Sequence, residues 1–129
     1  MTQKQPSKLE LAILSLLWEQ GDMKARAVLE ALPDGKERAY TSVLSVLQAM
    51  ERKGQVRHSR EQNVNVYHAV VKRQKTLGHT LHEMVRDLFG GSPTAAVQQL
   101  LQESDLSEKE LCAMEALLAE HRSKQHKSV

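Results

Sequence analysis

Residues 39–60 read AYTSVLSVLQAMERKGQVRHSR, and the periodicity of their apolar residues changes at Gly54. The apolar residues before this glycine recur every three or four positions, which predicts a helix from about Ala39 to Lys53. One side of that helix is apolar and carries Val43, Val46, Leu47 and Met50. Gly54 is the residue type that most readily closes a helix in a left-handed conformation. The stretch therefore predicts a helix that ends at a defined point.

Apolar and polar residues alternate after this glycine. Two β-prone runs, at residues 56–60 and 64–69, enclose the polar residues 61–63. Such alternation predicts two strands with one buried face each, and their short separation predicts a β-hairpin. The turn lacks the Asn-Gly or Asp-Gly pair that marks the commonest two-residue hairpin loops.

Two further helices are predicted before residue 39. Ser7 and Glu10 have the spacing of a capping box ahead of an apolar run, so a first helix starts there and stops at Gly21. Asp22 is placed to cap a short second helix through Leu32, and residues 33–35 form the loop to the third helix. Three short helices followed by a hairpin have the order of a winged helix-turn-helix. The predicted fold is therefore mainly α with a small β-hairpin.

The side of the third helix opposite its apolar face is small and polar. At 100° per residue, Thr41, Ser45 and Arg52 lie at the centre of this side, flanked by Ser42 and Gln48. Short hydroxyl side chains let a helix backbone approach base edges and phosphates, and Gln48 and Arg52 can donate hydrogen bonds. We therefore expect this side to enter a major groove. The alternative is an ordinary solvated helix face.

Positive charge is concentrated around this helix and the hairpin. Between Lys36 and Arg60 six basic residues accompany two acidic ones, whereas residues 72–129 hold eight of each. The hairpin of a winged helix lies beside its recognition helix, so Arg57, His58 and Arg60 are expected to contact flanking phosphates. The sequence thus predicts a DNA-binding domain over residues 1–71. The alternatives are a winged helix that binds protein or RNA, and a regulator that responds to a small ligand.

Residues 72–129 are predicted to form a helical dimerisation domain. Their apolar residues make narrow stripes that one small chain would leave partly exposed. Ser92-Pro93 and the capping box from Ser107 to Glu110 mark helix starts. A bundle within one chain would give the same stripes and is the alternative. The expected dimer contacts are Leu77, Leu81, Met84, Leu88, Leu100, Leu111, Met114, Leu117 and Leu118.

The length and composition fit either one compact unit or a small domain with an extension. Of 129 residues, 40% are hydrophobic and 26% are charged, which is the balance of a folded protein. No apolar run is long enough to span a bilayer, and the first residues lack the apolar stretch of a signal peptide. The single cysteine, Cys112, agrees with a reducing compartment. We therefore expect a cytoplasmic protein without a membrane partner.

Signatures of an enzyme are missing from the sequence. It has no Gly-rich phosphate loop, nucleophile elbow or Cys-His pairing. His79 and His82 share a helix face, but they lack the His-Glu-x-x-His order and an evident third ligand. These histidines are expected at the surface or at an interface. We expect no catalysis, no metal and no cofactor.

Several segments resemble the penicillinase repressor family, which includes methicillin-resistance and copper-transport repressors. They are the first helix from Leu9 to Leu17-Trp18, residues 39–48, Lys53-Gly54, and residues 106–111. The resemblance spans nearly the whole chain. It implies a homodimer on a palindromic operator, with base or phosphate contacts at Thr41, Ser42 and Ser45. It also implies repression by occupation of promoter DNA until a signal removes the dimer.

The signal itself does not follow from the resemblance. Antibiotic-responsive members are inactivated by proteolysis at an Asn-Phe bond, and the aligned pair here is Gln99-Leu100. Copper-responsive members carry a cysteine-rich metal hook at the C-terminus, whereas residues 123–129 contain no cysteine. An inactivating protease remains one hypothesis, and an unknown signal is the other.

Overall fold

The computed structural model describes residues 6–33 and 37–127, with the side chain of residue 127 left aside. Residues 34 and 35 of the predicted loop, and Lys36 of the basic segment, lie outside the described residues. The chain divides into two compact units, residues 1–83 and 84–129, and each is described by itself. The predicted domain boundary, between residues 71 and 72, precedes this division.

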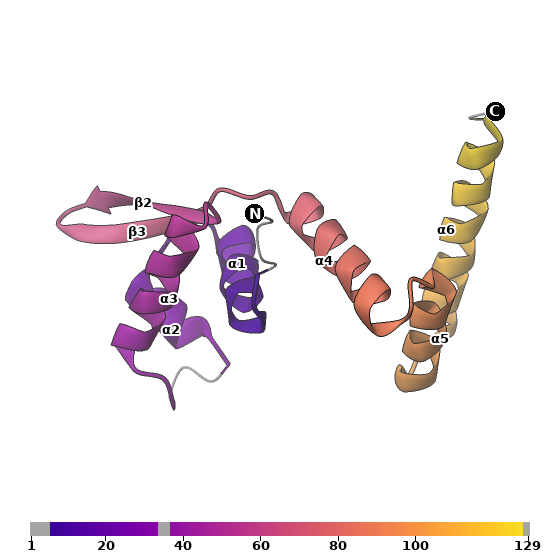
Figure 1. Ribbon diagram of the computed structural model, residues 1–129, viewed down its shortest axis with the longest axis horizontal. Helices are drawn as coiled ribbons and strands as arrows, with labels where there is room; N and C mark the ends of the chain where they lie inside the picture. Colours follow the sequence, from indigo (N-terminus) through magenta and orange to yellow (C-terminus); the bar gives the residue numbers. More distant parts are fainter. Residues whose placement is uncertain (1–5, 34–36, 128–129) are drawn as a thin grey trace. The chain divides into compact units, whose positions relative to one another are not determined.

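In the described part of the N-terminal unit, three helices and a small sheet follow one another in the order expected for a winged helix, and the first part of a fourth helix follows them (Figure 1). The elements are α1 (Lys8–Gln20), β1 (Met23–Lys24), α2 (Ala25–Ala31), α3 (Tyr40–Arg52), β2 (Val56–Glu61), β3 (Val64–Ala69) and the first part of α4 (Arg73–Leu88). The sheet is antiparallel with the order β1-β3-β2. The prediction of a mainly helical winged helix with a small β element is confirmed.

Helix α1 begins at the predicted capping box. The backbone N–H of Glu10 donates to Ser7 Oγ at 3.1 Å, and the backbone N–H of Ser7 donates to Glu10 Oε1 at 2.9 Å. These two bonds satisfy donors that the first turn of a helix cannot pair internally. The helix stops at Gly21, whose φ of 83° an L side chain rarely adopts.

The predicted cap of the second helix is wrong. Asp22 does not cap α2, whose N-cap is Lys24 and makes no side-chain cap bond. Met23 and Lys24 instead form the short strand β1, in register with Tyr67 and Val66 of β3. The side chain of Met23 is buried, so the sheet and the core together fix this segment before the helix can begin. A two-residue strand has no periodicity that a sequence could display.

Helix α3 ends as its sequence predicts. Gly54 has a φ of 82°, and its N–H donates to the carbonyl of Glu51 at 3.0 Å. The N–H of Gln55 donates to the carbonyl of Met50 at 2.9 Å. These two bonds make a Schellman motif, which pairs the last carbonyls of the helix and turns the chain into β2.

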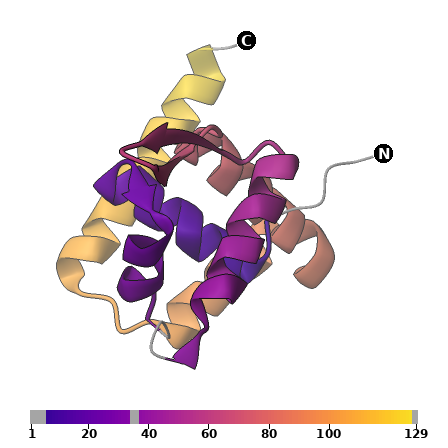
Figure 2. The same cartoon turned by 90° about the vertical axis from the view of Figure 1, so that its left-hand side faces the viewer.

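The hairpin is predicted correctly, although its turn carries no Asn-Gly pair. Val56 lies opposite Ala69 and Glu61 lies opposite Val64, so Gln62 and Asn63 form a two-residue loop. Both loop residues have positive φ, 49° and 66°, as tight turns of type I′ require. Figures 1 and 2 show this hairpin next to the C-terminal turn of α3.

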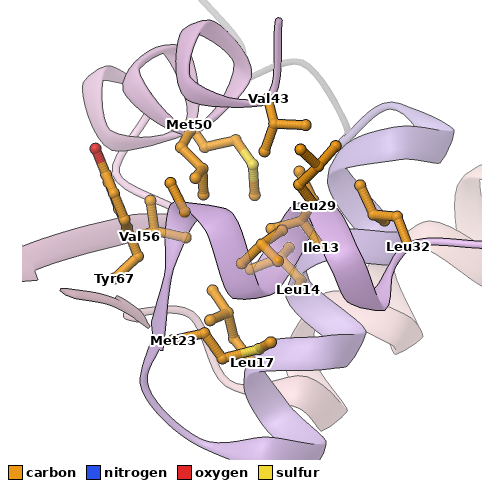
Figure 3. Packing of buried hydrophobic residues seen from close by; sticks show 13 residues of the cluster. Ile13, Leu14, Leu17, Met23, Leu29, Leu32, Val43, Met50, Val56 and Tyr67 are labelled. Atoms are coloured by element: carbon orange, nitrogen blue, oxygen red, sulfur yellow. The ribbon is translucent and has the colours of Figure 1, made fainter. Parts of the chain in front are cut away.

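One apolar core holds the N-terminal unit together. Val43 and Met50 project from α3 toward Ile13 of α1 and Leu29 of α2, and Tyr67 closes the core from the sheet (Figure 3). The remaining members of the core are Leu14, Leu17, Met23, Ala25, Val28, Leu32, Leu47 and Val56. The core fixes the rotation of α3 and therefore decides which of its side chains face outward.

The C-terminal unit consists of the end of α4, α5 (Pro93–Glu103) and α6 (Glu108–Lys127). Helix α5 starts at the predicted site, where Ser92 Oγ accepts from the N–H of Ala95 at 3.1 Å. Ser107 Oγ likewise accepts from the N–H of Glu110 at 3.2 Å at the start of α6. No residue from 84 to 126, all of which are described, is buried in the single chain. This unit has helices but no interior of its own.

Candidate nucleic-acid interface

The outer face of α3 is the polar surface that the sequence singles out. All five of its residues are exposed, whereas Val43, Leu47 and Met50 on the opposite side have no exposed area. The outer face therefore stands directly away from the core. Its residues are Thr41, Ser42, Ser45, Gln48 and Arg52.

An ion pair fixes the C-terminal end of α3 against α1. Lys53 Nζ lies 2.8 Å from Glu10 Oε2, and the Glu10 side chain is 6% exposed. Glu10 thus serves two helices, since its other carboxylate oxygen accepts from Ser7 in the capping box of α1. A carboxylate in so dry a place keeps its charge only when it is hydrogen-bonded on several sides.

The balance of these forces lowers the pKa of Glu10. Burial alone would raise its pKa, but the hydrogen bond and charge of Lys53, the backbone N–H of Ser7 and the side chain of Gln55 outweigh that effect. The carboxylate is therefore ionised through the neutral range, and the pair with Lys53 is present under physiological conditions.

The hairpin carries the three basic residues on different faces. Arg57 lies opposite His68 of β3, while His58 lies opposite Tyr67 and Arg60 lies opposite Asn65. Because successive side chains of a strand alternate, Arg57 points to one face and His58 and Arg60 point to the other. All three side chains are exposed, but because they lie on opposite faces of the hairpin they cannot all contact the same surface of a partner.

His58 links the hairpin to α3. Its Nδ1 lies 2.6 Å from Glu51 Oε1, and its ring is 5.5 Å from the ring of Tyr67. The pKa of Tyr67 is raised, first by burial and then by the nearby charge of Glu51. His58 therefore has a place in the joint between α3 and β2, in addition to the phosphate contact expected from its charge.

Two contacts within the N-terminal unit were not predicted from the sequence. The guanidinium of Arg26 in α2 lies 4.8 Å from the centre of the Tyr40 ring, at the start of α3. The indole N–H of Trp18 donates to the carbonyl of Val71 at 3.0 Å, which ties α1 to the segment after β3. Neither pair is close in the sequence, and neither spacing corresponds to a motif.

The expected dimer contacts are largely exposed in the single chain. Leu81, Leu88, Leu100, Leu117 and Leu118 are each more than 60% exposed. Met84 and Leu111 are exposed to 43% and 37%, and Leu77 and Met114 are half-buried. Val97 and Leu101 lie on the same apolar stripe of α5 as Leu100 and are also exposed, to 51% and 45%.

The two histidines of α4, His79 and His82, are exposed in the single chain, as the sequence predicts for surface residues. His79 Nε2 lies 3.9 Å from Glu83 Oε1, one turn further along the helix. Within the described ranges no group of three or more metal-ligating side chains comes together. No helix in the part of the chain that the structure describes is long and apolar enough to cross a membrane.

Comparison with known proteins adds a family and a fold. The sequence profile of the penicillinase repressors matches residues 6–120. The penicillinase repressor of Bacillus licheniformis is 21% identical over 120 residues, which cover 93% of this chain and 94% of that protein.

Solved structures of MarR-type proteins share the fold. A MarR family protein from Bacillus stearothermophilus is 18% identical, with a TM-score of 0.51 over 93% of this chain and 75% of that one. The YusO protein of Bacillus subtilis is 15% identical, with a TM-score of 0.52 over 91% of this chain and 74% of that one. At these identities the likeness speaks for the fold alone.

Proposed function

This chain belongs to the penicillinase repressor family, and from that premise we propose that it binds a palindromic operator as a homodimer and represses transcription by occupying promoter DNA. Membership makes the chain a DNA-binding transcriptional regulator and not an enzyme. The operator, the homodimer and the contact residues are the content of the proposal.

The exposed outer face of α3 is the observation that carries the proposal. Thr41, Ser42 and Ser45 are short, so the helix backbone can approach the floor of a major groove. Gln48 and Arg52 extend the same face by two turns and offer hydrogen-bond donors to base edges and phosphates. The core on the opposite side and the Lys53–Glu10 pair hold this face rigid before binding.

The hairpin is proposed to contact the DNA backbone beside α3. Arg57 and Arg60 are exposed on opposite faces of the hairpin, so each would reach a different phosphate. His58 would contribute less, because its ring is already engaged with Glu51 and Tyr67. Contacts of this kind add affinity and salt dependence without reading sequence.

The homodimer is supported by the lack of an interior in the C-terminal unit. Each large apolar side chain that leaves water contributes about 1.5–3 kcal/mol, so the exposed leucines of α4, α5 and α6 favour burial against a second copy. A two-fold dimer places two copies of α3 on DNA and calls for an inverted repeat.

The release of the repressor is left to a signal of unknown kind. Cleavage by a protease at Gln99-Leu100 would require local opening, because this bond lies inside α5, where Gln99 also bonds Glu103 at 3.2 Å. We place the repressor in the cytoplasm, as the sequence predicts, where it can reach chromosomal DNA.

Selection from a pool of random duplex DNA tests the proposal. The purified full-length chain should enrich an inverted repeat, and its affinity for the selected duplex should fall steeply with salt. Sedimentation equilibrium on the same preparation should give a dimer. If the folded protein enriches no sequence, the proposal of a specific operator is wrong. If it is a monomer that binds a single half-site, the proposal of a homodimer is wrong.

A further inference from the structure

We infer that Arg26 is an additional contact to the DNA backbone and that the ring of Tyr40 holds its guanidinium in position. This inference rests on the proposed function. It concerns a residue of α2 that neither the charge pattern of residues 36–60 nor any motif singles out. The ligand is a phosphodiester group of the duplex that α3 reads.

The position of Arg26 follows from its contact with Tyr40. The guanidinium carbon lies 4.8 Å from the ring centre, within the range of a cation–π attraction. Tyr40 is the first residue of α3 and directly precedes Thr41, so the positive charge stands beside the first turn of the outer face. A helix in a major groove has phosphates along its flanks, and a cation there lies within reach of them.

The flank on which Tyr40 lies is the same one that meets the hairpin. At 100° per residue, Tyr40 and Glu51 are about 20° apart around α3, and they lie about 120° and 100° from the middle of the outer face. Glu51 holds His58 of β2 near one end of this flank, and Arg26 stands on Tyr40 at the other. The cationic side chain of Arg26 therefore lies at one end of this flank and the imidazole of His58 lies at the other.

The donors of Arg26 remain available for a ligand. The side chain is exposed, and within the described part of the chain no carboxylate lies in ion-pair range of it. Attraction to a ring uses no acceptor oxygen, so the guanidinium keeps its planar set of N–H donors for a phosphate. Holding a long side chain in one place before binding lowers the entropy that the contact would otherwise cost.

The experiment measures duplex affinity over a salt series for the full-length chain and five variants. The probes are the inverted repeat selected above and a duplex of random sequence. Arg26→Ala should weaken binding to both probes about tenfold and reduce the slope of log affinity against log salt by about 0.9, the loss of one phosphate contact. Arg122→Ala, an exposed arginine of α6, is the matched control and should change neither quantity.

Two substitutions of Tyr40 test the role of the ring. Tyr40→Phe keeps the ring and should bind as the unmodified chain does. Tyr40→Leu keeps the charge of Arg26 but removes its support, so the salt slope should stay while affinity falls about threefold. Thermal unfolding of each variant identifies any loss of affinity that comes from misfolding. If Arg26→Ala folds poorly, Arg26→Lys takes its place as a test: it retains the charge and should give the salt slope of the unmodified chain.

The outcomes separate this inference from the proposed function. An unmodified chain that binds no duplex would overturn both. Normal binding with an unchanged salt slope in folded Arg26→Ala would overturn the phosphate contact alone. Equal losses in Tyr40→Phe and Tyr40→Leu would show that the hydroxyl group, not the ring, matters, and would overturn the role given to stacking.

Discussion

Nδ1 of His58 on β2 lies 2.6 Å from Oε1 of Glu51 in the last turn of α3. This bond joins the helix that faces DNA to the hairpin beside it, across the turn at Gly54. Both side chains are about one-third exposed, so solvent weakens the pair but does not separate it.

Replacement of either partner should loosen the joint between α3 and β2. We expect His58→Ala to lower the free energy of unfolding by about 1 kcal/mol, since it loses both the hydrogen bond and the contact with Tyr67. A double-mutant cycle with Glu51→Ala should give a coupling of about 0.5–1 kcal/mol by urea unfolding. Strict additivity of the two single changes would show that the bond contributes nothing to stability.

Substitutions at Glu10 should separate the capping box from the ion pair. Glu10→Gln can still accept from the backbone of Ser7 but cannot pair ionically with Lys53, so we expect a loss of about 1–2 kcal/mol. Glu10→Ala loses both interactions and leaves Lys53 without its partner, for which about 2–3 kcal/mol is expected. Equal losses in the two variants, measured by denaturant unfolding, would mean that only the ion pair with Lys53 matters and that the capping bond contributes nothing.

The stability of the unmodified chain should depend on pH through the same carboxylate. Because the pKa of Glu10 is lowered from 4.5 in the folded chain, its contribution is complete above that ordinary value and disappears as the pH falls through the lowered one. Below it a protonated Glu10 resembles glutamine. The difference in unfolding free energy between the unmodified chain and Glu10→Gln should therefore be complete above pH 4.5 and shrink toward zero as the pH falls through the lowered pKa of Glu10. A difference that is constant over this range would contradict the assignment.

Acidic substitution on the outer face of α3 should abolish DNA binding without loss of fold. Ser45→Glu places a carboxylate against phosphates and base edges, and like charges brought together cost several kcal/mol, so affinity should fall roughly 100-fold or more. Ser123→Glu makes the same chemical change at an exposed position of α6 and should bind normally. Circular dichroism and sedimentation should match those of the unmodified chain. Unfolding of Ser45→Glu would instead place this residue in the core.

A charge within the apolar stripe of α6 should dissociate the dimer. In a two-fold interface Leu117→Lys removes an apolar contact and adds a charge in both copies. We therefore expect the dimer dissociation constant to rise roughly 100-fold. Ser123→Lys lies on the opposite side of the same helix from Leu111, Leu117 and Leu118 and should leave the dimer intact. Weaker operator binding should accompany dissociation in the first variant. An unchanged sedimentation profile for Leu117→Lys would remove this stripe from the interface.

The sequence predicted those parts of the fold that rest on local chemistry. The capping box at Ser7 and Glu10, the helix end at Gly54 and the alternation of β3 each act within a few residues, so their patterns are visible in one dimension. Strand β1 was missed because Met23 and Lys24 become a strand only by pairing with β3, more than 40 positions later.

The candidate site was predictable to the same extent. Rotation about a helix axis is enough to place Thr41, Ser45 and Arg52 on one exposed side, because the apolar side must face a core. The contacts that hold this surface in place, Glu51 with His58 and Arg26 with Tyr40, arise from tertiary packing and from side-chain conformations. No spacing rule in the sequence could have paired them.

The missing interior of the C-terminal unit has a consequence for gene dosage. If the helices of residues 84–126 pack only against a second copy, the fraction of molecules in which they are packed depends on the concentration of the protein in the cell. At cellular concentrations well below the dissociation constant, the amount of dimer rises approximately with the square of the amount synthesised. The output of the promoter would then respond more steeply to small changes in the expression of this repressor than it would to a monomeric repressor. Newly made chains would remain accessible to proteases until they dimerise.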